Sequence, residues 1–484
     1  MKFILLVLSV ASLGSHTIPQ TVSGSESRAL FVLNEAPREL PAENRISVAS
    51  QREANITFDP VVIASMPNTI TFPLFDGRVF TAQRYSGASK AVWNGKIIAP
   101  DFDGDVILTF NEGFVAGLIY SPAGVYEITP YRDKHLLMEI DQSALPECGG
   151  EVPSETAPFV REPAAGVESG DRIDVLVMYT TATKNTLGGD AQARTHAQQA
   201  VNSSNVAYLN SQIRMRLNLV QAVEYAYVES PTTQTDLANL RADQNVQNLR
   251  NEYNADLVAM IGEVQGVCGV AYLMGPVGGN PNTGFSVTGR VCAVSTLSFA
   301  HELGHNMGSH HNPENGSGPT YPYGFGHYVN GSFRTVMSYS NQCTVTCDRR
   351  AYFSNPGVFR GPHPTGIENE RDNARSINNT ADTIANYRYS GASISMDSTG
   401  NSTTIPRLIG KDLRWTSDGL TGNVRIELSR DQGFTWTTIV EDTPDDGFER
   451  IHVNGRPTKR ARLRISSIDH IGVSDSNVTD IAIR

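Results

Sequence analysis

The chain has 484 residues, which is enough for three domains of ordinary size, and 39% of them are hydrophobic, as is typical of a globular protein. Its formal net charge is −11 at pH 7, and Lys and Arg form no sustained run. These features argue against nucleic acid and against an anionic membrane surface as partners.

The start of the chain predicts export. Met1 and Lys2 form a short basic segment, and residues 3–13 are an apolar run followed by small residues. This is the composition of a secretory signal peptide over residues 1–15, and the run is too short to span a bilayer. A buried N-terminal helix is the alternative. We therefore expect a secreted, extracellular protein without membrane insertion.

Residues 21–150 predict a β-rich domain. Runs of β-branched and aromatic residues recur at 61–63, 69–74, 106–110 and 115–120. Turn residues separate them, as at Asn94–Gly95 and Asp103–Gly104. Residues 151–170 contain three prolines and few large apolar side chains, and they predict a linker in which a processing cut would fall.

Residues 171–388 predict an α/β domain. Strands are expected at 173–179, 213–223 and 255–261, and helices at 188–209, 237–249 and 372–387. Their alternation indicates a mixed sheet with helices packed on it. A further helix is expected to begin near Ser295 or Thr296, either of which is a suitable N-cap.

The segment 301–311, HELGHNMGSHH, predicts a catalytic zinc site. His301 and His305 lie four residues apart, so on a helix both imidazoles project from one face. Gly308 lets the chain leave the helix in a left-handed conformation, and the turn brings back His311 as a third nitrogen ligand. Three neutral imidazoles leave a zinc ion with an open fourth position.

Two neighbouring residues complete this interpretation. Glu302 lies beside the first histidine, where its carboxylate can reach a water on the shared metal. The spacing from Gly308 selects His311 as the ligand, so His310 is expected at the surface. The alternative is a helix whose histidines are solvated or satisfied within the core.

A Met-containing turn follows at residues 335–339, TVMSY. The long histidine motif with such a turn is the metzincin signature. The sequence resembles that clan of zinc endopeptidases, and within it the bacterial reprolysin-like (adamalysin-related) group. The resemblance covers about residues 170–388. Asn312 follows the third histidine where adamalysins usually carry Asp.

The resemblance implies two further roles. Met337 would form an apolar floor under the three imidazoles, and Tyr339 would bind the zinc or stabilise the oxyanion. Ordinary core packing of Met337 and ordinary burial of Tyr339 with a hydrogen-bonded hydroxyl are the alternatives.

Four of the five cysteines fall within residues 171–388, and in an exported protein an even set predicts disulfides. Proximity in the sequence suggests Cys268–Cys292 and Cys343–Cys347, although four cysteines allow three pairings.

The fifth cysteine, Cys148, lies in the segment LPECGG before the zinc motif. A thiolate is a strong zinc ligand and could fill the open fourth position. This resembles the cysteine switch of metzincin propeptides, although Glu147 stands where a basic residue is common. A free or intermolecularly paired thiol is the alternative.

The end of the chain predicts an accessory domain. Residues 389–403 are rich in Ser, Gly and Thr and indicate a linker. Residues 404–484 alternate apolar and polar residues between turn signals, which predicts a β-sandwich. Trp415 and Trp436 could expose a face that binds a surface or matrix, but such tryptophans more often lie in a core.

Together these patterns predict a multidomain chain, with a metzincin-type α/β catalytic domain between a β-rich propeptide and a C-terminal β-sandwich. The expected function is that of a secreted zinc endopeptidase, made as a latent zymogen, which hydrolyses protein or peptide substrates with Glu302 as general base. Calcium is a second candidate ion, but no ligand set stands out. The alternatives are an adhesion protein with a catalytically weak zinc site that acts through the C-terminal domain, and a zinc hydrolase of non-peptide substrates.

Overall fold

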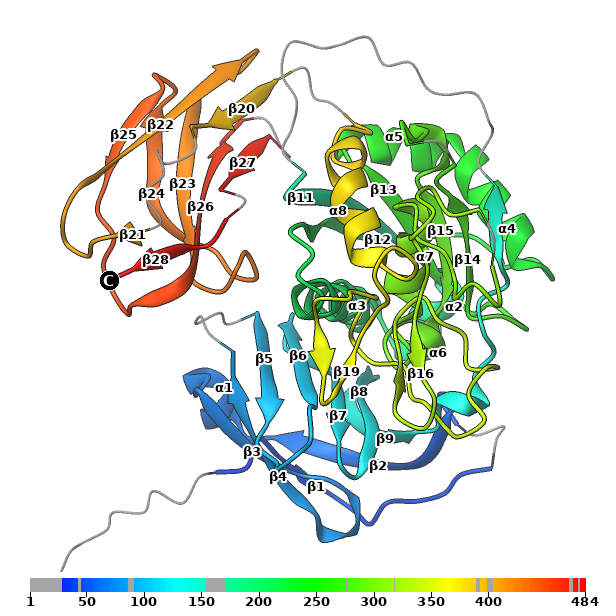
Figure 1. Cartoon of the computed structure of the whole chain (residues 1–484). Coiled ribbons are helices and arrows are strands. Elements are labelled where there is room, and N and C mark those ends of the chain that lie inside the picture. The colour runs from blue at the N-terminus through cyan, green and yellow to red at the C-terminus, as the bar shows by residue number, and fades with distance from the viewer. Residues whose placement is uncertain are drawn as a thin grey trace, which may run out of the picture.

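The computed structural model describes most of the chain, in three parts that are blue to cyan, green to yellow, and orange to red in Figure 1. The described residues are 28–41, 45–85, 91–153, 170–275, 277–316, 318–388, 392–397, 404–469, 473–477 and 479–484. The expected signal peptide and most residues of the two expected linkers lie outside them. Among the described residues, no helix has the length and apolar character needed to cross a bilayer.

The N-terminal part is one antiparallel sheet of nine strands in the order β1-β2-β9-β8-β7-β6-β5-β4-β3. The strands are β1 (Phe31–Leu33), β2 (Ser50–Phe58), β3 (Thr69–Pro73), β4 (Val79–Arg84), β5 (Val92–Ile97), β6 (Asp105–Asn111), β7 (Phe114–Ser121), β8 (Gly124–Tyr131) and β9 (Lys134–Ile140). Two expectations were wrong here. Residues 61–63 belong to helix α1 (Pro60–Ser65), and Asn94–Gly95 lies within β5.

The central part contains a six-stranded mixed sheet, as the alternation of elements predicts. Its order is β10-β14-β15-β13-β11-β12, and only the β14–β15 pair is antiparallel. The strands are β10 (Glu151–Pro153), β11 (Arg172–Thr180), β12 (Arg216–Tyr225), β13 (Leu257–Gly262), β14 (Gly269–Leu273) and β15 (Phe285–Gly289). Strand β10 falls inside the expected linker, where it pairs with β14 and forms the edge of the sheet.

Helices cover the central sheet. They are α2 (Thr181–Leu187), α3 (Asp190–Asn210), α4 (Thr233–Ala242), α5 (Gln244–Glu252), α6 (Arg290–Ala293), α7 (Ser298–Asn306) and α8 (Asn373–Ile384). The single helix expected at 237–249 is two helices, because Asp243 has an extended backbone and its side chain caps α5. Two short hairpins, β16–β17 (Tyr328–Val329 and Phe333–Arg334) and β18–β19 (Phe359–Arg360 and His363–Pro364), follow α7.

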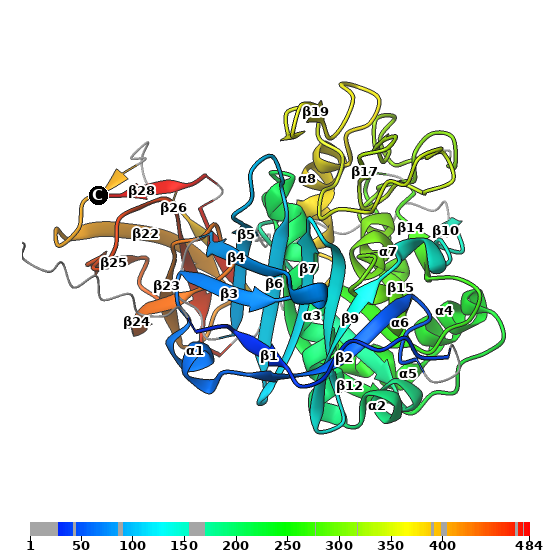
Figure 2. The same ribbon diagram turned by 90° about the horizontal axis from the view of Figure 1, so that it is seen from below.

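Helix α3 lies between the N-terminal sheet and the central sheet, as Figures 1 and 2 show. It is therefore buried on several sides, and some of its polar side chains form hydrogen bonds with the N-terminal sheet. Gln199 donates to the carbonyl of Ile107, and Asn202 donates to that of Leu108. The N-terminal sheet thus covers a partly polar face of the central part.

The C-terminal part consists of two sheets that share one apolar core. One sheet is β20-β22-β25 (Ser393–Met396, Lys411–Asp418, Phe448–Ile451). The other is β21-β28-β26-β23-β24 (Thr404–Ile405, Ile481–Ile483, Thr458–Ser467, Asn423–Ser429, Thr437–Pro444), with β27 (Ser474–Ser476) paired to β26. Strand β20 lies within the linker expected at 389–403. Trp415 is buried in the core, and Trp436 is half-buried under the guanidinium of Arg464.

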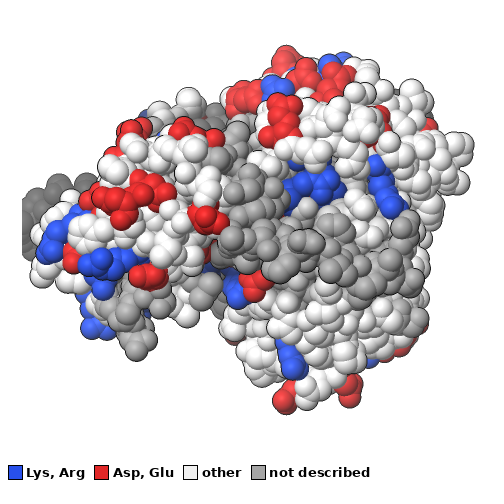
Figure 3. Space-filling view, turned by 90° about the horizontal axis from the view of Figure 1, so that it is seen from above, with Lys and Arg blue, Asp and Glu red and all other residues white. Residues whose placement is uncertain are grey.

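Charged side chains of both signs lie on the face shown in Figure 3. Among the described residues of that face, Asp and Glu gather in patches, whereas Lys and Arg stand in small separate groups and form no continuous basic surface. The net charge of −11 is therefore accompanied by mixed signs on this side of the molecule.

Candidate active site

Helix α7 and the turn after it bring the three predicted histidines together. His301 and His305 are fully buried on one face of α7, and Gly308 has φ +81°, which lets His311 return to them. The helix starts without a side-chain cap, because its N-cap position is Leu297. The expected caps were wrong, since the hydroxyls of Ser295 and Thr296 donate to carbonyls one turn earlier.

The geometry of the imidazoles fits a zinc ion. The Nε2 atom of His311 lies 3.1 Å from that of His305 and 3.2 Å from that of His301. The edge of a tetrahedron around zinc with Zn–N bonds of 2.0–2.1 Å is about 3.3 Å. The Nδ1 atoms of His301 and His305 lie 2.8 and 3.0 Å from the carbonyls of Val336 and Ser309, which leaves Nε2 free to ligate.

Glu302 lies beside this cluster and is fully buried. Burial raises the pKa of its carboxyl group to about 8. Its Oε1 atom has no hydrogen-bond partner among the described residues, and Oε2 accepts from the thiol of Cys148 at 3.6 Å. Gly269 on β14 leaves room for the carboxylate, since a Cβ there would lie 2.5 Å from Oε1.

Cys148 reaches the same cluster from the N-terminal segment. Its Sγ atom and the ligand nitrogens of the three histidines lie within 4.8 Å of one another, which is the arrangement of a four-ligand site. The neighbouring backbone is bound to the edge of the central sheet. Cys268 N donates to the Glu147 carbonyl at 3.0 Å, and Gly149 N donates to the Gly269 carbonyl at 2.8 Å.

Acidic residues flank Cys148 on both sides, and each has a basic partner. Glu147 pairs with Arg334 and Arg349, and although burial opposes ionisation, these guanidinium groups lower the pKa of its carboxyl group. Glu151 lies 2.9 Å from Nε2 of His310. The expectation of a surface His310 was wrong, because its side chain is fully buried between the turn and Glu151.

Met337 and Tyr339 both adjoin the histidines. Met337 is fully buried beneath α7, where a Cβ at Gly304 would lie 2.5 Å from its sulfur. The Tyr339 ring lies 4.1 Å from that of His311, and its hydroxyl donates to the Cys148 carbonyl at 2.9 Å. Asn312 holds this turn, because its side-chain oxygen accepts from Tyr339 N at 3.0 Å.

Two disulfides lie near the site, Cys268–Cys292 and Cys343–Cys347, in the pairing that sequence proximity suggests. The first joins the residue before β14 to α6, and the second closes a short loop after Tyr339. Cys148 is the free cysteine among the described residues.

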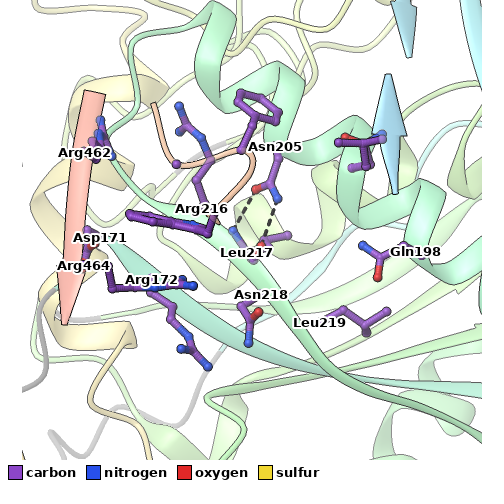
Figure 4. A pocket seen from close by; sticks show the side chains of 15 residues that line it. Asp171, Arg172, Gln198, Asn205, Arg216, Leu217, Asn218, Leu219, Arg462 and Arg464 are labelled. Carbon is purple, nitrogen blue, oxygen red and sulfur yellow. Dashed lines mark hydrogen bonds between the residues drawn. The ribbon is translucent and has the colours of Figure 1, made fainter. Parts of the chain in front are cut away.

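A cavity of about 190 Å³ lies between the central and C-terminal parts (Figure 4). Its arginines come from β11, β12 and β26. Each has protein partners: Arg172 pairs with Asp174, Arg464 with Glu427 and Arg462 with Asp480, and Arg216 donates to two backbone carbonyls. The cavity therefore presents no free cationic group and no catalytic constellation, and we assign it no ligand.

Comparison with known proteins places this site in a family. The model of metallo-peptidase family M12, reprolysin-like, matches residues 169–354, which include the histidine motif and the turn after it. A peptidyl-Asp metalloendopeptidase of Stenotrophomonas maltophilia R551-3 is 30% identical over 336 residues, covering 62% of this chain and 77% of that protein. The chain therefore belongs to the M12 reprolysin-like metallopeptidases, and it is a metalloendopeptidase.

Two other relatives carry the same name. That of Xanthomonas campestris pv. campestris is 30% identical over 299 residues, covering 58% of this chain and 69% of that protein. That of Pseudomonas aeruginosa PAO1 is 31% identical over 286 residues, covering 52% of this chain and 46% of that protein. Each is named a peptidyl-Asp metalloendopeptidase.

Several site residues were missed by sequence reasoning. Gly269, Arg334, Arg349 and Ser340 carry no local motif, and only their long-range placement brings them to Glu302 or Glu147. One signal was available, because an acidic residue before Cys148 in a position that is commonly basic calls for a basic partner.

Proposed function

We propose that the chain is the latent precursor of a secreted, zinc-dependent endopeptidase, with Glu302 as general base and Cys148 as the group that closes the site. The observation that carries this proposal is the convergence of three imidazole nitrogens, a buried carboxylate and one thiol in a single cluster. Secretion rests on the predicted signal peptide.

Each residue of the site has a distinct proposed role. His301, His305 and His311 would hold a zinc ion, which supplies Lewis acidity toward the scissile carbonyl. Glu302 accepts the proton of the attacking water and returns it to the leaving amine. The Tyr339 hydroxyl, which donates to a backbone carbonyl in the latent chain, would donate to the substrate carbonyl at the same place.

Latency would come from the segment around Cys148 and from the N-terminal sheet. The thiol occupies the position that a substrate carbonyl and the attacking water require, next to Glu302. The sheet contacts the central part through amide side chains such as Gln199 and Asn202 on α3. The boundary also has an apolar component, because sheet residues such as Ile107, Leu118 and Leu136 belong to the same hydrophobic core as the central part.

The names of the relatives suggest the substrate. We propose that the processed enzyme cleaves peptide bonds next to acidic residues, Asp in particular. The relatives that this chain matches over most of their length are named peptidyl-Asp metalloendopeptidases.

The first experiment is cleavage of casein or gelatin by the processed protein, with and without a zinc chelator, beside a Glu302→Ala variant. We expect cleavage by the parent alone, with zinc still bound to Glu302→Ala because Glu302 is not a ligand. Full activity of that variant would remove the proposed mechanism. A zinc-loaded parent that cleaves nothing would favour a binding role through the C-terminal domain.

A further inference from the structure

Glu147 fills a basic pocket beside the predicted zinc ligands. Its Oε1 atom accepts hydrogen bonds from the backbone nitrogen and hydroxyl of Ser340, at 2.8 and 2.6 Å. Its Oε2 atom accepts from Nη1 of Arg334 at 3.3 Å and from Nη2 of Arg349 at 3.1 Å. Both oxygens of one carboxylate are thus saturated by four donors from the central part.

The central part itself fixes the donors of this pocket. Arg349 is 2% exposed, and its guanidinium donates to the carbonyls of Thr296 at 2.9 Å and Ser338 at 3.3 Å. Arg334 is 4% exposed and donates to the same Ser338 carbonyl at 2.8 Å. Because these bonds do not involve Glu147, the pocket keeps its shape when Glu147 leaves, and a preorganised pocket binds its ligand more tightly.

The two guanidinium groups make the pocket positively charged, which favours an anionic ligand. Among the described residues, Glu147 is the carboxylate that forms an ion pair with Arg334 or with Arg349. Removal of the N-terminal segment leaves two nearly buried cations without this partner. Breaking a buried pair in this way is unfavourable, because it leaves buried charge without compensation. An acidic side chain of a substrate would restore the lost interactions.

The pocket lies where the side chain of a substrate residue next to the scissile bond would be placed. The segment 147–149 is held by backbone hydrogen bonds to Cys268 and Gly269 at the edge of the central sheet, and Cys148 reaches the histidine cluster. An extended peptide can use the same edge groups, as peptides that add to a sheet edge generally do. When its scissile residue takes the place of Cys148, the adjacent side chain lies at the pocket.

We propose that Arg334, Arg349 and Ser340 form the specificity pocket for an acidic side chain adjacent to the scissile bond, and that Glu147 occupies it in the latent chain as a pseudo-substrate. This inference rests on the proposed peptidase function and deepens it. It also explains why an acidic residue precedes Cys148 in this chain.

The first test measures the selectivity of the processed enzyme. Matched peptides carry Asp, Asn, Glu, Gln or Ala at one position, placed on either side of a single cleavable bond. We expect kcat/KM for the Asp peptide to exceed that for its Asn counterpart by about 10- to 100-fold, the range given by hydrogen bonds to a charged group. The preference is expected on one side of the bond.

Variants then test which residues determine the selectivity for Asp over Asn. Arg349→Gln is expected to lower the Asp-to-Asn ratio of kcat/KM by at least about tenfold, and Ser340→Ala by a smaller factor of about 3–10. The matched control is Arg350→Gln, because Arg350 is also nearly buried but pairs with Asp348 instead of Glu147. The ratio for this control should equal that of the parent.

A second measurement does not depend on whether the arginine variants fold. Synthetic peptides of residues 145–150, made with Ser in place of Cys148 to remove zinc binding by the thiol, are tested as inhibitors of the unmodified processed enzyme. Replacement of Glu147 by Gln in this peptide should raise Ki about tenfold or more. In the full chain, Glu147→Gln should increase the activity before processing, because it removes the charge that pairs with Arg334 and Arg349.

The outcomes separate this inference from the proposed function. A parent that cleaves the Ala, Asn and Asp peptides equally well would be a peptidase without the proposed pocket, and the inference would be wrong. An Asp preference that survives in folded Arg349→Gln and Ser340→Ala, or equal Ki values for the Glu and Gln peptides, would also overturn it. A zinc-loaded parent that cleaves no peptide at all would instead overturn the proposed function.

Discussion

The Sγ atom of Cys148 lies 3.6 Å from Oε2 of Glu302, and it is 3.9 Å from Nε2 of His305. One thiol therefore contacts both a proposed metal ligand and the proposed general base. Burial, followed by the charge of Glu302, raises the pKa of the thiol well above its ordinary value in the metal-free cluster. Release of this residue would free the ligand position and the carboxylate in a single event.

Replacement of Cys148 should weaken latency. In the full chain, Cys148→Ala removes the thiol but leaves Glu147 and β10 bound to the central part, so we expect a partial gain in activity of about tenfold before processing. A quenched fluorescent peptide measures this gain. The double variant with Glu302→Ala is the control and should be inactive. A Cys148→Ala chain as inert as the parent would show that the thiol contributes nothing to latency.

Gly269→Ala should reduce catalysis without loss of zinc. The new Cβ would lie 2.5 Å from Oε1 and 2.7 Å from Cγ of Glu302, so the carboxylate must move from its present position. Misplacement of a catalytic group by about 1 Å can reduce the rate about 10²-fold, and we expect kcat/KM to fall by that order.

Gly278→Ala is the matched control for this variant, since no atom of the described residues lies within 4 Å of its added Cβ. Zinc content is measured on both proteins. Normal kcat/KM in a zinc-loaded Gly269→Ala enzyme would mean that the carboxylate tolerates displacement or that Glu302 is not the base.

The parts of the site that the sequence predicted are those held by local geometry. His301, His305 and His311 share one helix and one turn, so their spacing alone brings them together. Arg334, Arg349 and Gly269 come to the site through tertiary packing, which no local pattern encodes. His310 was misplaced for a similar reason, because one partner of its buried ring is Glu151, 159 residues earlier in the chain.

Errors in the predicted elements have similarly specific causes. The apolar run at residues 61–63 predicts a strand, but Pro60 at the first helical position and the Asp59 side chain, which accepts from two backbone nitrogens, stabilise helix α1 instead. Asn94–Gly95 has the composition of a turn, yet neighbouring strands pair with both residues inside β5. Here the tertiary context of the sheet overrides the local preference.

Loss of the Cys268–Cys292 disulfide should destabilise the catalytic part. It links residues separated by 24 positions, so its removal by Cys268→Ala/Cys292→Ala should lower the free energy of unfolding by about 3 kcal/mol. The Cys343–Cys347 bridge spans only 4 positions, and its removal should cost about 2 kcal/mol or less by the same chain-entropy argument. Denaturant unfolding in a Glu302→Ala background, which prevents autolysis, measures both. A larger loss for the short bridge would contradict this ranking.

Acidification should loosen the N-terminal sheet through His135. Its ring packs against Phe58 and Phe114 at centroid distances of 5.0 and 5.8 Å, and its Nε2 atom accepts a hydrogen bond from Val115 N at 3.0 Å. Burial lowers the pKa of this imidazole from 6.5 to about 4. The unfolded chain therefore binds more protons than the folded chain between these values, and the stabilising contribution present above pH 6.5 is lost as the pH falls toward 4.

We expect this loss to amount to about 1–2 kcal/mol after allowance for the partial exposure of the ring. Hydrogen exchange of the Val115 amide measures it directly, because protonation of Nε2 removes the acceptor of that N–H. His135→Gln is the matched control, since its side-chain oxygen can accept the same bond without titrating. Once intrinsic exchange rates are corrected for, protection of Val115 should fall between pH 6.5 and 4 in the parent but stay nearly constant in the variant. Parallel profiles for the two proteins would assign the acid sensitivity of the sheet to other groups.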